Sequence, residues 1–225
     1  MVKRLSSHRF LFIAKDGIPI ILGLFFLGVL FSLFHVFFIS VPILTFALFS
    51  IWFFRDPQRK SAPDERTIVS PADGRVVEAV DSDKVRDVDL GEFVGEYKRL
   101  SIFMSVISVH VNRAPCFARV RQVIHRLGKF LPADKSEASF QNESNLVLLE
   151  DEKSKERFIV KQIAGILARR IICWVKTGDI VQKGERFGMI KFGSRVDIFI
   201  PKSFEFTVKR GDKVKAGETI IGRKN

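Results

Sequence analysis

An uncharged stretch near the N-terminus constrains this chain more than any other feature. From Gly17 to Phe54 the sequence runs for 38 residues without Lys, Arg, Asp or Glu. As one straight helix this stretch would be about 57 Å long, whereas the hydrocarbon core of a bilayer is about 30 Å thick. Pro42 cannot continue a helical hydrogen-bond ladder and offers a break near the middle. We therefore predict that residues 1–54 form a membrane anchor, a hairpin of two short transmembrane helices.

Basic residues flank this stretch on both sides. Lys15 and three earlier basic residues precede it, and Arg55, Arg59 and Lys60 follow it. Because positively charged flanks stay on the cytoplasmic side, the hairpin would leave the rest of the chain at a cell membrane, facing the cytoplasm. A cleaved signal peptide is the alternative, but it would have a much shorter apolar region followed by a small-residue cleavage site.

The formal net charge of +12 favours an anionic partner. Nucleic acid is not expected, because the sequence has no zinc-finger spacing, no aromatic-basic RNA-binding pattern and no long basic run. An anionic membrane surface is the simpler partner, since each well-placed Lys or Arg adds about 1 kcal/mol of attraction. Cys116 and Cys173 match no metal or redox spacing, so reduced structural thiols and no metal site are predicted.

The rest of the chain is predicted to be a polar linker, residues 55–66, and a folded domain, residues 67–225. Short runs rich in β-branched residues alternate there with Gly, Asp and Pro, which predicts a mostly β domain. The expected strands include residues 76–80, 99–111, 119–123, 145–150 and 157–163. Residues 164–175 suit either a helix or a buried strand.

An internal repeat marks the last third of the chain. The pattern V-K-x-G-D-x-V-x-x-G-E begins at Val175 and again at Val208, a shift of 33 residues. This pattern is similar to the flattened β-sandwich of the biotinyl/lipoyl type, a barrel-sandwich hybrid in which two related halves pack face to face. The similarity concerns the fold alone, because such folds include carriers, adaptors and enzymes.

A single Gly-Ser pair, Gly193 and Ser194, interrupts an apolar run between the two copies of the repeat. Taken alone, such a pair is typical of a β-bulge. Other segments change this interpretation because they occur together and in a fixed order. They are F-F-R-D-P from Phe53, V-S-P-A-D-G-R-V from Val69, F-M-S-V-I-S-V-H-V-N-R-A-P from Phe103, Q-I-A-G with A-R-R-I within 162–171, and F-G-S-R-V-D around the pair itself.

This motif series, which extends from Phe53 to the C-terminus, resembles that of the short, pyruvoyl-dependent phosphatidylserine decarboxylases. The resemblance implies a proenzyme that cuts its own chain between Gly193 and Ser194 by serinolysis. The Ser194 hydroxyl would attack the Gly193 carbonyl to give an ester, and elimination followed by loss of ammonia would leave a pyruvoyl group. Residues 1–193 would become the β chain and 194–225 the α chain of a heterodimer.

A neutral serine hydroxyl is a weak nucleophile, so Ser194 needs a base. The resemblance assigns that role to His110, held by Asp73, as in a Ser-His-Asp triad. The residues alone also suit simpler roles, namely a buried structural histidine between two valines and an aspartate in a Pro-Ala-Asp-Gly turn. Asn112 and Arg113, on the same motif as His110, are predicted to hold the phosphate or carboxylate of the substrate, although an Arg at a strand end also suits a solvated position.

The resemblance further implies a Schiff base between the pyruvoyl group and the amine of phosphatidylserine, with no pyridoxal phosphate and no metal. Loss of CO₂ would yield phosphatidylethanolamine for membrane phospholipid synthesis, with His110 protonating the carbanion. Another serine-headgroup lipid as substrate, and a higher oligomer, stay open.

Two non-enzymatic functions are the alternatives. A membrane-anchored adaptor would carry a long helical hairpin, which is not indicated here, and a biotin or lipoate carrier would have an acidic or Met-rich turn around its modified lysine, which Lys191 lacks.

Overall fold

The structure is a computed structural model that describes residues 12–85, 88–135, 137–166, 170–191 and 193–224. The chain divides into two compact units, residues 7–58 and, in the main, 59–225. We call them the hairpin unit and, after the activity that the resemblance implies, the catalytic unit. The predicted linker, residues 55–66, crosses this division. Its residues from Arg59 onward belong to the catalytic unit, where the Ser61 hydroxyl donates a hydrogen bond to the Gly217 carbonyl at 2.6 Å.

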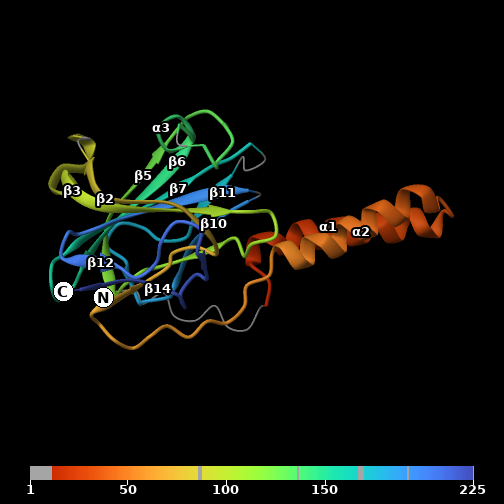
Figure 1. Cartoon of the computed structure of the whole chain (residues 1–225). Helices are drawn as coiled ribbons and strands as arrows, with labels where there is room; N and C mark the ends of the chain where they lie inside the picture. The colour runs from red at the N-terminus through yellow and green to blue at the C-terminus, as the bar shows by residue number, and fades with distance from the viewer. Residues whose placement is uncertain (1–11, 86–87, 136, 167–169, 192, 225) are drawn as a thin grey trace. The chain divides into compact units, whose positions relative to one another are not determined.

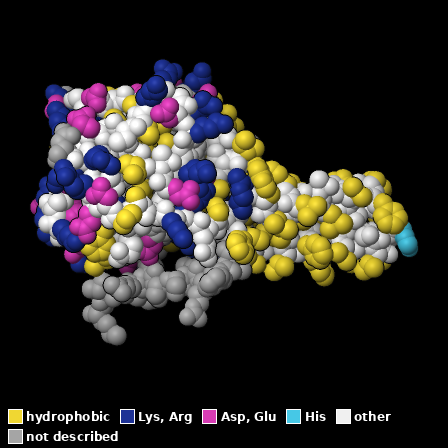
Figure 2. Space-filling model, turned by 60° about the horizontal axis from the view of Figure 1, so that its bottom comes forward, with side chains coloured by type: hydrophobic (Ala, Val, Ile, Leu, Met, Phe, Trp, Pro, Cys, Tyr) yellow, Lys and Arg dark blue, Asp and Glu magenta, His cyan; other side chains and the backbone are white. Residues whose placement is uncertain are grey.

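The hairpin unit consists of two apolar helices, α1 (Ile18–Leu33) and α2 (Phe37–Phe53), after a short 3-10 turn η1 (Lys15–Gly17). Small residues let the two helices approach closely. The Ser40 hydroxyl donates to the Gly28 carbonyl at 2.9 Å, and a Cβ atom on Gly28 would lie 2.6 Å from a methyl carbon of Leu44. Hydrophobic side chains cover the visible surface of these helices, whereas charged side chains are scattered over the catalytic unit (Figure 2).

The break between the two helices was predicted at the wrong residue. Pro42 lies inside α2, and the chain instead reverses at His35, whose φ of 57° is left-handed. The His35 N–H bonds the Ser32 carbonyl, and the Val36 N–H bonds the Phe31 carbonyl at 2.9 Å, which satisfies the last carbonyls of α1. Proline removes only its own N–H from the ladder, and α2 continues past it.

One of these helical segments, Lys15–Leu33, is long and apolar enough to cross a membrane, and Phe37–Phe53 is a shorter apolar helix. At about 1.5 Å per residue, the 17 residues of α2 extend for roughly 26 Å, a little less than a typical hydrocarbon core. The apolar N-terminal hairpin is therefore observed, and its crossing of a bilayer by both helices stays a prediction.

The catalytic unit is mostly β, as predicted, and its largest sheet curls into a half-barrel (Figure 1). This sheet has eight strands in the order β13-β2-β3-β11-β7-β6-β5-β9. In chain order the strands are β2 (Gly74–Val85), β3 (Gly95–Met104), β5 (Ala118–Arg126), β6 (Ser144–Asp151), β7 (Arg157–Ile163), β9 (Ile180–Val181), β11 (Ser194–Ile200) and β13 (Lys213–Val214).

Two small sheets and two short helices complete the unit. One sheet has the order β1-β14-β12, and the other has the order β4-β10-β8. Their strands are β1 (Thr67–Val69), β4 (Val111–Arg113), β8 (Ile171–Cys173), β10 (Arg186–Ile190), β12 (Phe204–Phe206) and β14 (Ile220–Lys224). The helices are η2 (Val88–Phe93) and α3 (Ala138–Gln141).

Two of the expected elements differ from the structure. The single strand predicted for residues 99–111 is divided, because β3 ends at Met104 and β4 begins at Val111 after a turn in which the Ser108 N–H bonds the Ser105 carbonyl. The stretch 164–175, which suited either a helix or a strand, contains strand β8, and its described residues form no helix. In isoleucine-rich runs of this length, periodicity alone does not distinguish a helix from a buried strand.

The two copies of the repeat occupy equivalent places at the two edges of the eight-stranded sheet. Strand β9, from the first copy, pairs with β5, and β13, from the second copy, pairs with β2. Each copy begins with a turn in which the aspartate accepts a backbone N–H, Lys176 to Asp179 at 2.8 Å and Lys209 to Asp212 at 3.0 Å. The sequence repeat is therefore also a structural repeat.

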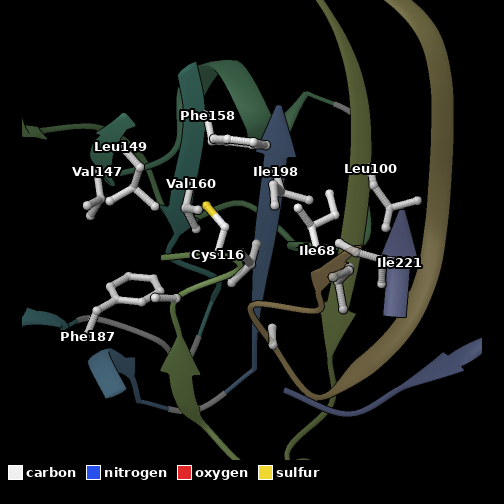
Figure 3. Close-up of a cluster of buried hydrophobic side chains, with 14 of the residues drawn as sticks. Ile68, Leu100, Cys116, Val147, Leu149, Phe158, Val160, Phe187, Ile198 and Ile221 are labelled. Carbon is white, nitrogen blue, oxygen red and sulfur yellow. The ribbon is translucent and has the colours of Figure 1, made fainter. Parts of the chain in front are cut away.

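Strand alternation divides the sheet into an inner and an outer face. Leu100, Val160 and Ile198, from neighbouring strands, point into a large inner core together with Phe158 and Cys116 (Figure 3). Residues one position further along these strands belong to the outer face. Both cysteines are free, and burial raises the pKa of the Cys116 thiol, which agrees with a structural rather than a reactive role.

Candidate active site

The Gly193–Ser194 pair lies at a corner of the chain between two sheets. Strand β10 ends at Ile190 in a three-stranded sheet, and β11 begins at Ser194 in the eight-stranded sheet. From Ser194 onward β11 pairs with β3 in unbroken register, so the pair does not form a bulge within a strand. Phe192, which also belongs to the predicted motif, lies outside the described residues.

Ser194 is fully buried on the inner face, and its hydroxyl lies 3.4 Å from the sulfur of Met104. Gly193 just before it has a φ of +58°, in the left-handed region that a residue with a side chain rarely adopts. The backbone is therefore left-handed at the residue whose carbonyl the sequence predicts to be attacked. This conformation is available to glycine at little cost, which explains why glycine suits the position.

The carbonyl of Gly193 is closely approached by the backbone of Gly165. A Cβ atom on Gly165 would lie 2.3 Å from the Gly193 oxygen and 3.3 Å from the Gly193 carbonyl carbon. No other residue type fits there without displacing that carbonyl. Gly165 belongs to the Q-I-A-G motif, but its contact could not be predicted from the sequence, because it joins two loops that are distant in the sequence.

The side-chain amide of Asn142 holds the backbone around Gly165. Its NH₂ group donates to the carbonyls of Ala164 and Leu131, both at 2.8 Å, and its oxygen accepts the Leu131 N–H at 2.9 Å. Asn142 is buried, so these bonds are shielded from water. Asn142 thus ties the β5–β6 connection to the loop that contacts the Gly193 carbonyl, a role that no motif in the sequence indicates.

His110 is fully buried in the segment between β3 and β4. Its backbone carbonyl accepts the N–H of Ile190, the last residue of β10, at 3.3 Å. His110 is thereby fixed beside the segment that leads into the Gly193–Ser194 corner. Ser194 in turn pairs with Met104, the last residue of the strand that leads towards His110.

Asp73 lies in the bend between β1 and β2, and its carboxylate has two described partners. One oxygen accepts the backbone N–H of Ala216 at 2.7 Å, and the other lies 3.0 Å from an Nη atom of Arg59. The same bend contacts β4, because the Arg113 N–H donates to the Pro71 carbonyl at 2.9 Å. The structure thus positions Asp73 on a segment packed against the strand that follows His110, and their direct pairing stays a prediction.

Asn112 belongs to a buried chain of uncharged polar groups that ends at Ser194. The Asn145 amide donates to Gln162 at 2.9 Å, and the Gln162 amide donates to the Asn112 oxygen at 2.8 Å. The Asn112 NH₂ group lies 3.7 Å from the same Met104 sulfur that the Ser194 hydroxyl contacts. Each of these side chains is at most 3% exposed, so the chain is isolated from solvent.

Arg113 points to a different part of the unit. Its guanidinium donates to the Gly184 carbonyl at 3.0 Å, and its side chain packs against Gly217, where a Cβ atom would lie 2.8 Å from the Arg113 Cδ. Gly184 and Gly217 are the second glycines of the two repeat copies. Arg113 is therefore buried between the repeat turns.

The outer face behind Ser194 carries a cluster of charged groups. The guanidinium of Arg195, only 1% exposed, pairs with Asp197 at 2.6 Å and with Glu78 at 3.1 Å. Glu78 also binds Arg99 at 2.9 Å, and this hydrogen-bonded pair lowers the pKa of the Glu78 carboxyl. Because Ser194 and Arg195 are adjacent in one strand, the charged cluster and the serine lie on opposite faces of the sheet.

Comparison with known proteins gives a consistent result. The family model described as phosphatidylserine decarboxylase matches residues 46–222. The phosphatidylserine decarboxylase proenzyme of Syntrophus aciditrophicus (strain SB) is 45% identical over 213 residues, which cover 94% of this chain and 97% of that protein. The protein of the same name from Geotalea uraniireducens (strain Rf4) is 42% identical over 210 residues, 93% of this chain and 95% of its own length.

Proposed function

Since the chain belongs to the phosphatidylserine decarboxylase family, we propose that it is a self-processing proenzyme that decarboxylates phosphatidylserine to phosphatidylethanolamine. The observation that carries the proposal is the corner at residues 193–194, where a left-handed glycine precedes a fully buried serine. The names of the related proteins support both the decarboxylase activity and the existence of a precursor that is processed.

The proposed cleavage needs no residue outside the chain for its bond changes. The Ser194 oxygen attacks the Gly193 carbonyl, and the peptide bond is exchanged for an ester while the Ser194 nitrogen becomes an amine. Removal of the Ser194 α-proton then breaks the ester, which frees the Gly193 carboxylate and leaves a dehydroalanine at residue 194. Water adds to the tautomeric imine and ammonia leaves, so a pyruvoyl group begins the 194–225 chain.

Positioning supports the first of these steps. Gly165 confines the Gly193 carbonyl, and Asn142 holds the Gly165 backbone, so the carbonyl is fixed before attack. The described contact of the Ser194 hydroxyl is neutral, the Met104 sulfur that the Asn112 amide also contacts. Oriented groups that meet only after folding would explain why a chain can be synthesised intact and cleave itself afterwards.

His110 is the proposed base for Ser194, with Asp73 as its partner. Imidazole titrates near neutral pH, so His110 can accept the hydroxyl proton and later return it. Burial of His110 and its backbone bond to the end of β10 support this role. In the mature enzyme the same imidazole would protonate the substrate carbon from which CO₂ has left.

The group formed at residue 194 fits its surroundings, because it would begin β11 in a buried, largely uncharged setting. A pyruvoyl carbonyl supplies the site of condensation with the substrate amine and the electron sink for decarboxylation. Asn112 and Arg113 are the proposed headgroup contacts. The Asn112 amide and the Ser194 hydroxyl both contact the Met104 sulfur, and Arg113 is the next residue of the same strand, β4.

The hairpin unit is the proposed membrane anchor. Both helices would cross the bilayer and return the catalytic unit to the cytoplasmic side, where its positive charge favours anionic lipid. The two processed chains would remain associated as a heterodimer, because β11 pairs with β3 along its whole length and with β7 from Arg195 to Phe199.

Intact mass measurement after denaturing electrophoresis tests the proposal. Wild-type protein is expected to yield two chains, residues 1–193 and 194–225, and the smaller one should resist Edman sequencing and react with a carbonyl reagent. Ser194→Ala should stay full length. Ser82→Ala, an exposed serine on β2, is the matched control and should be cleaved normally. An uncut wild-type chain, or cleavage of Ser194→Ala at this bond, would overturn the proposal.

A further inference from the structure

Large hydrophobic side chains are exposed at only a few described positions of the catalytic unit, even though its core is extensive. The described ones are Val94, Ile107, Leu127, Phe130, Phe140 and Ile166. Single exposed hydrophobic residues are common on soluble proteins, but a group of them on one surface indicates a binding site. Whether these six residues indicate a binding site therefore depends on whether they lie at the same end of the sheet.

Strand register shows which loops share an end of the eight-stranded sheet. Ser194, the first residue of β11, pairs with Met104, the last residue of β3. Ile163, the last residue of β7, pairs with the second residue of β11 and with Ser144, the first of β6. Ser144 in turn pairs with Arg126, the last residue of β5. The loops next to these residues all leave the sheet at the end where Ser194 lies.

Five of the six exposed hydrophobic residues are in these loops. Ile107 follows β3, Ile166 follows β7, and the β5–β6 connection carries Leu127, Phe130 and Phe140. Ile166 is next in sequence to the glycine that contacts the Gly193 carbonyl. We call these five residues the apolar rim. The most exposed of them are Leu127 at 88% and Phe140 at 80%.

The opposite end of the sheet is different. Val94 is its single exposed large hydrophobic residue among those described, in the β2–β3 connection, where Val85 pairs with Gly95. The apolar rim is also accompanied by exposed basic side chains, Lys129, Lys135 and Arg170, against two exposed acidic ones. The acidic residues are Asp134 and Glu137.

We propose that the apolar rim is a docking surface through which the catalytic unit inserts into a lipid bilayer that carries anionic headgroups. Exposed aliphatic and aromatic side chains beside basic ones are suited to the boundary between headgroups and acyl chains. This inference rests on the proposed function. It explains how a headgroup could reach residue 194 while both acyl chains of the lipid stay in the bilayer.

Fluorescence quenching in vesicles tests the insertion directly. The full-length protein, with Cys173 replaced by Ser and the buried Cys116 kept, would carry one environment-sensitive thiol label at residue 107, 140 or 94. In vesicles of phosphatidylcholine and phosphatidylglycerol containing nitroxide lipids, labels at 107 and 140 should be quenched and the label at 94 should not. Equal quenching at 140 and 94 would overturn the proposal. A blue-shifted but unquenched label at 140 would do the same, because a protein surface would then cover the rim.

Activity on two forms of one substrate provides the second arm. Leu127→Ser combined with Phe140→Ser should lower the rate on phosphatidylserine in vesicles about tenfold relative to the rate on monomeric dihexanoyl phosphatidylserine. Val94→Ser, the matched control at the opposite end, should leave that ratio unchanged. An unchanged ratio in the double variant contradicts the docking surface. If wild-type protein converts neither substrate, the proposed function fails, and the quenching result still decides whether the rim inserts.

Discussion

The two faces of the sheet around β11 bury different kinds of polar group. On the inner face, the Ser194 hydroxyl ends a chain of uncharged amides that runs through Asn112 and Gln162. On the outer face, one residue further along the same strand, Arg195 is held by Asp197 and further charged groups. Ser194, Arg195 and Asp197 are all buried, so at these residues the two faces differ in charge and not in exposure.

Because of this difference, the groups proposed to react lie on one face of the sheet and the charged groups that stabilise the fold lie on the other. A full charge acts strongly on its neighbours in a buried setting, so an ion beside Ser194 would bias the protonation of the groups that cleave the chain. On the outer face, paired ions hold β2, β3 and β11 together without reaching the serine. The alternation of a β-strand provides the separation with no additional structure.

The largest expected effect comes from breaking the charged cluster. Arg195→Met, made in a Ser194→Ala protein so that the chain stays uncut, leaves Asp197 buried without its cation. The free energy of unfolding should fall by about 3–5 kcal/mol, measured by urea denaturation. Arg119→Met removes the partially exposed pair with Glu152 and should cost much less. A similar loss in both variants would show that the buried cluster contributes no more to the free energy of unfolding than a partially exposed ion pair does.

The next effect concerns the inner face. Gly165→Ala requires the Gly193 carbonyl to move, because the new methyl group would lie 2.3 Å from its oxygen. Self-cleavage should slow about a hundredfold, which can be followed as the uncut fraction over time after cell-free synthesis. Gly95→Ala, where a Cβ atom meets nothing closer than 3.8 Å, should be cleaved at the wild-type rate. Cleavage of Gly165→Ala at the normal rate would show that Gly165 does not position the Gly193 carbonyl for cleavage.

A charge placed on the neutral face should have a moderate effect. Gln162→Glu loses the N–H that Asn112 accepts and buries a carboxylate, so unfolding of the uncut protein should become easier by about 1–3 kcal/mol. Burial disfavours the charged form, so the loss should be greater at pH 8 than at about pH 5. Gln122→Glu, an exposed position on β5, serves as the control and should change little. A loss of stability that does not depend on pH would show that Gln162→Glu acts through packing and not through its buried charge.

The smallest effect is a pH dependence that originates in the charged cluster. Hydrogen bonding to Arg99 lowers the pKa of Glu78 below its ordinary value of 4.5. Its contribution is therefore fully present above that value, and it is lost as the pH falls from there through the folded-state pKa. Urea midpoints of the uncut protein should show a smaller decline below pH 4.5 in Glu78→Gln than in the parent. Glu137→Gln, in the exposed β5–β6 connection, should retain the parent's decline.

Much of the fold could be predicted because it follows from local patterns. An uncharged stretch twice the length of a helical span indicated a hairpin, and the repeat indicated two related strand-turn units. The predicted break at Pro42 was wrong, because proline removes only one N–H and α2 continues past it. The chain reverses instead at His35, where the N–H groups of His35 and Val36 satisfy carbonyls at the end of α1. The division of residues 99–111 was missed because the turn at Ser105 carries no glycine or proline.

The sequence by itself determined the family, the mostly β character, the apolar hairpin and the Gly193–Ser194 pair, since each is written in contiguous residues. Only the tertiary structure decided what surrounds that pair. Gly165 and Met104 contact it from a separate loop and a separate strand, Asn142 holds the loop that carries Gly165, and the apolar rim is assembled from three connections. Contacts of this kind depend on strand register and chain reversal, which bring together residues that no local pattern relates.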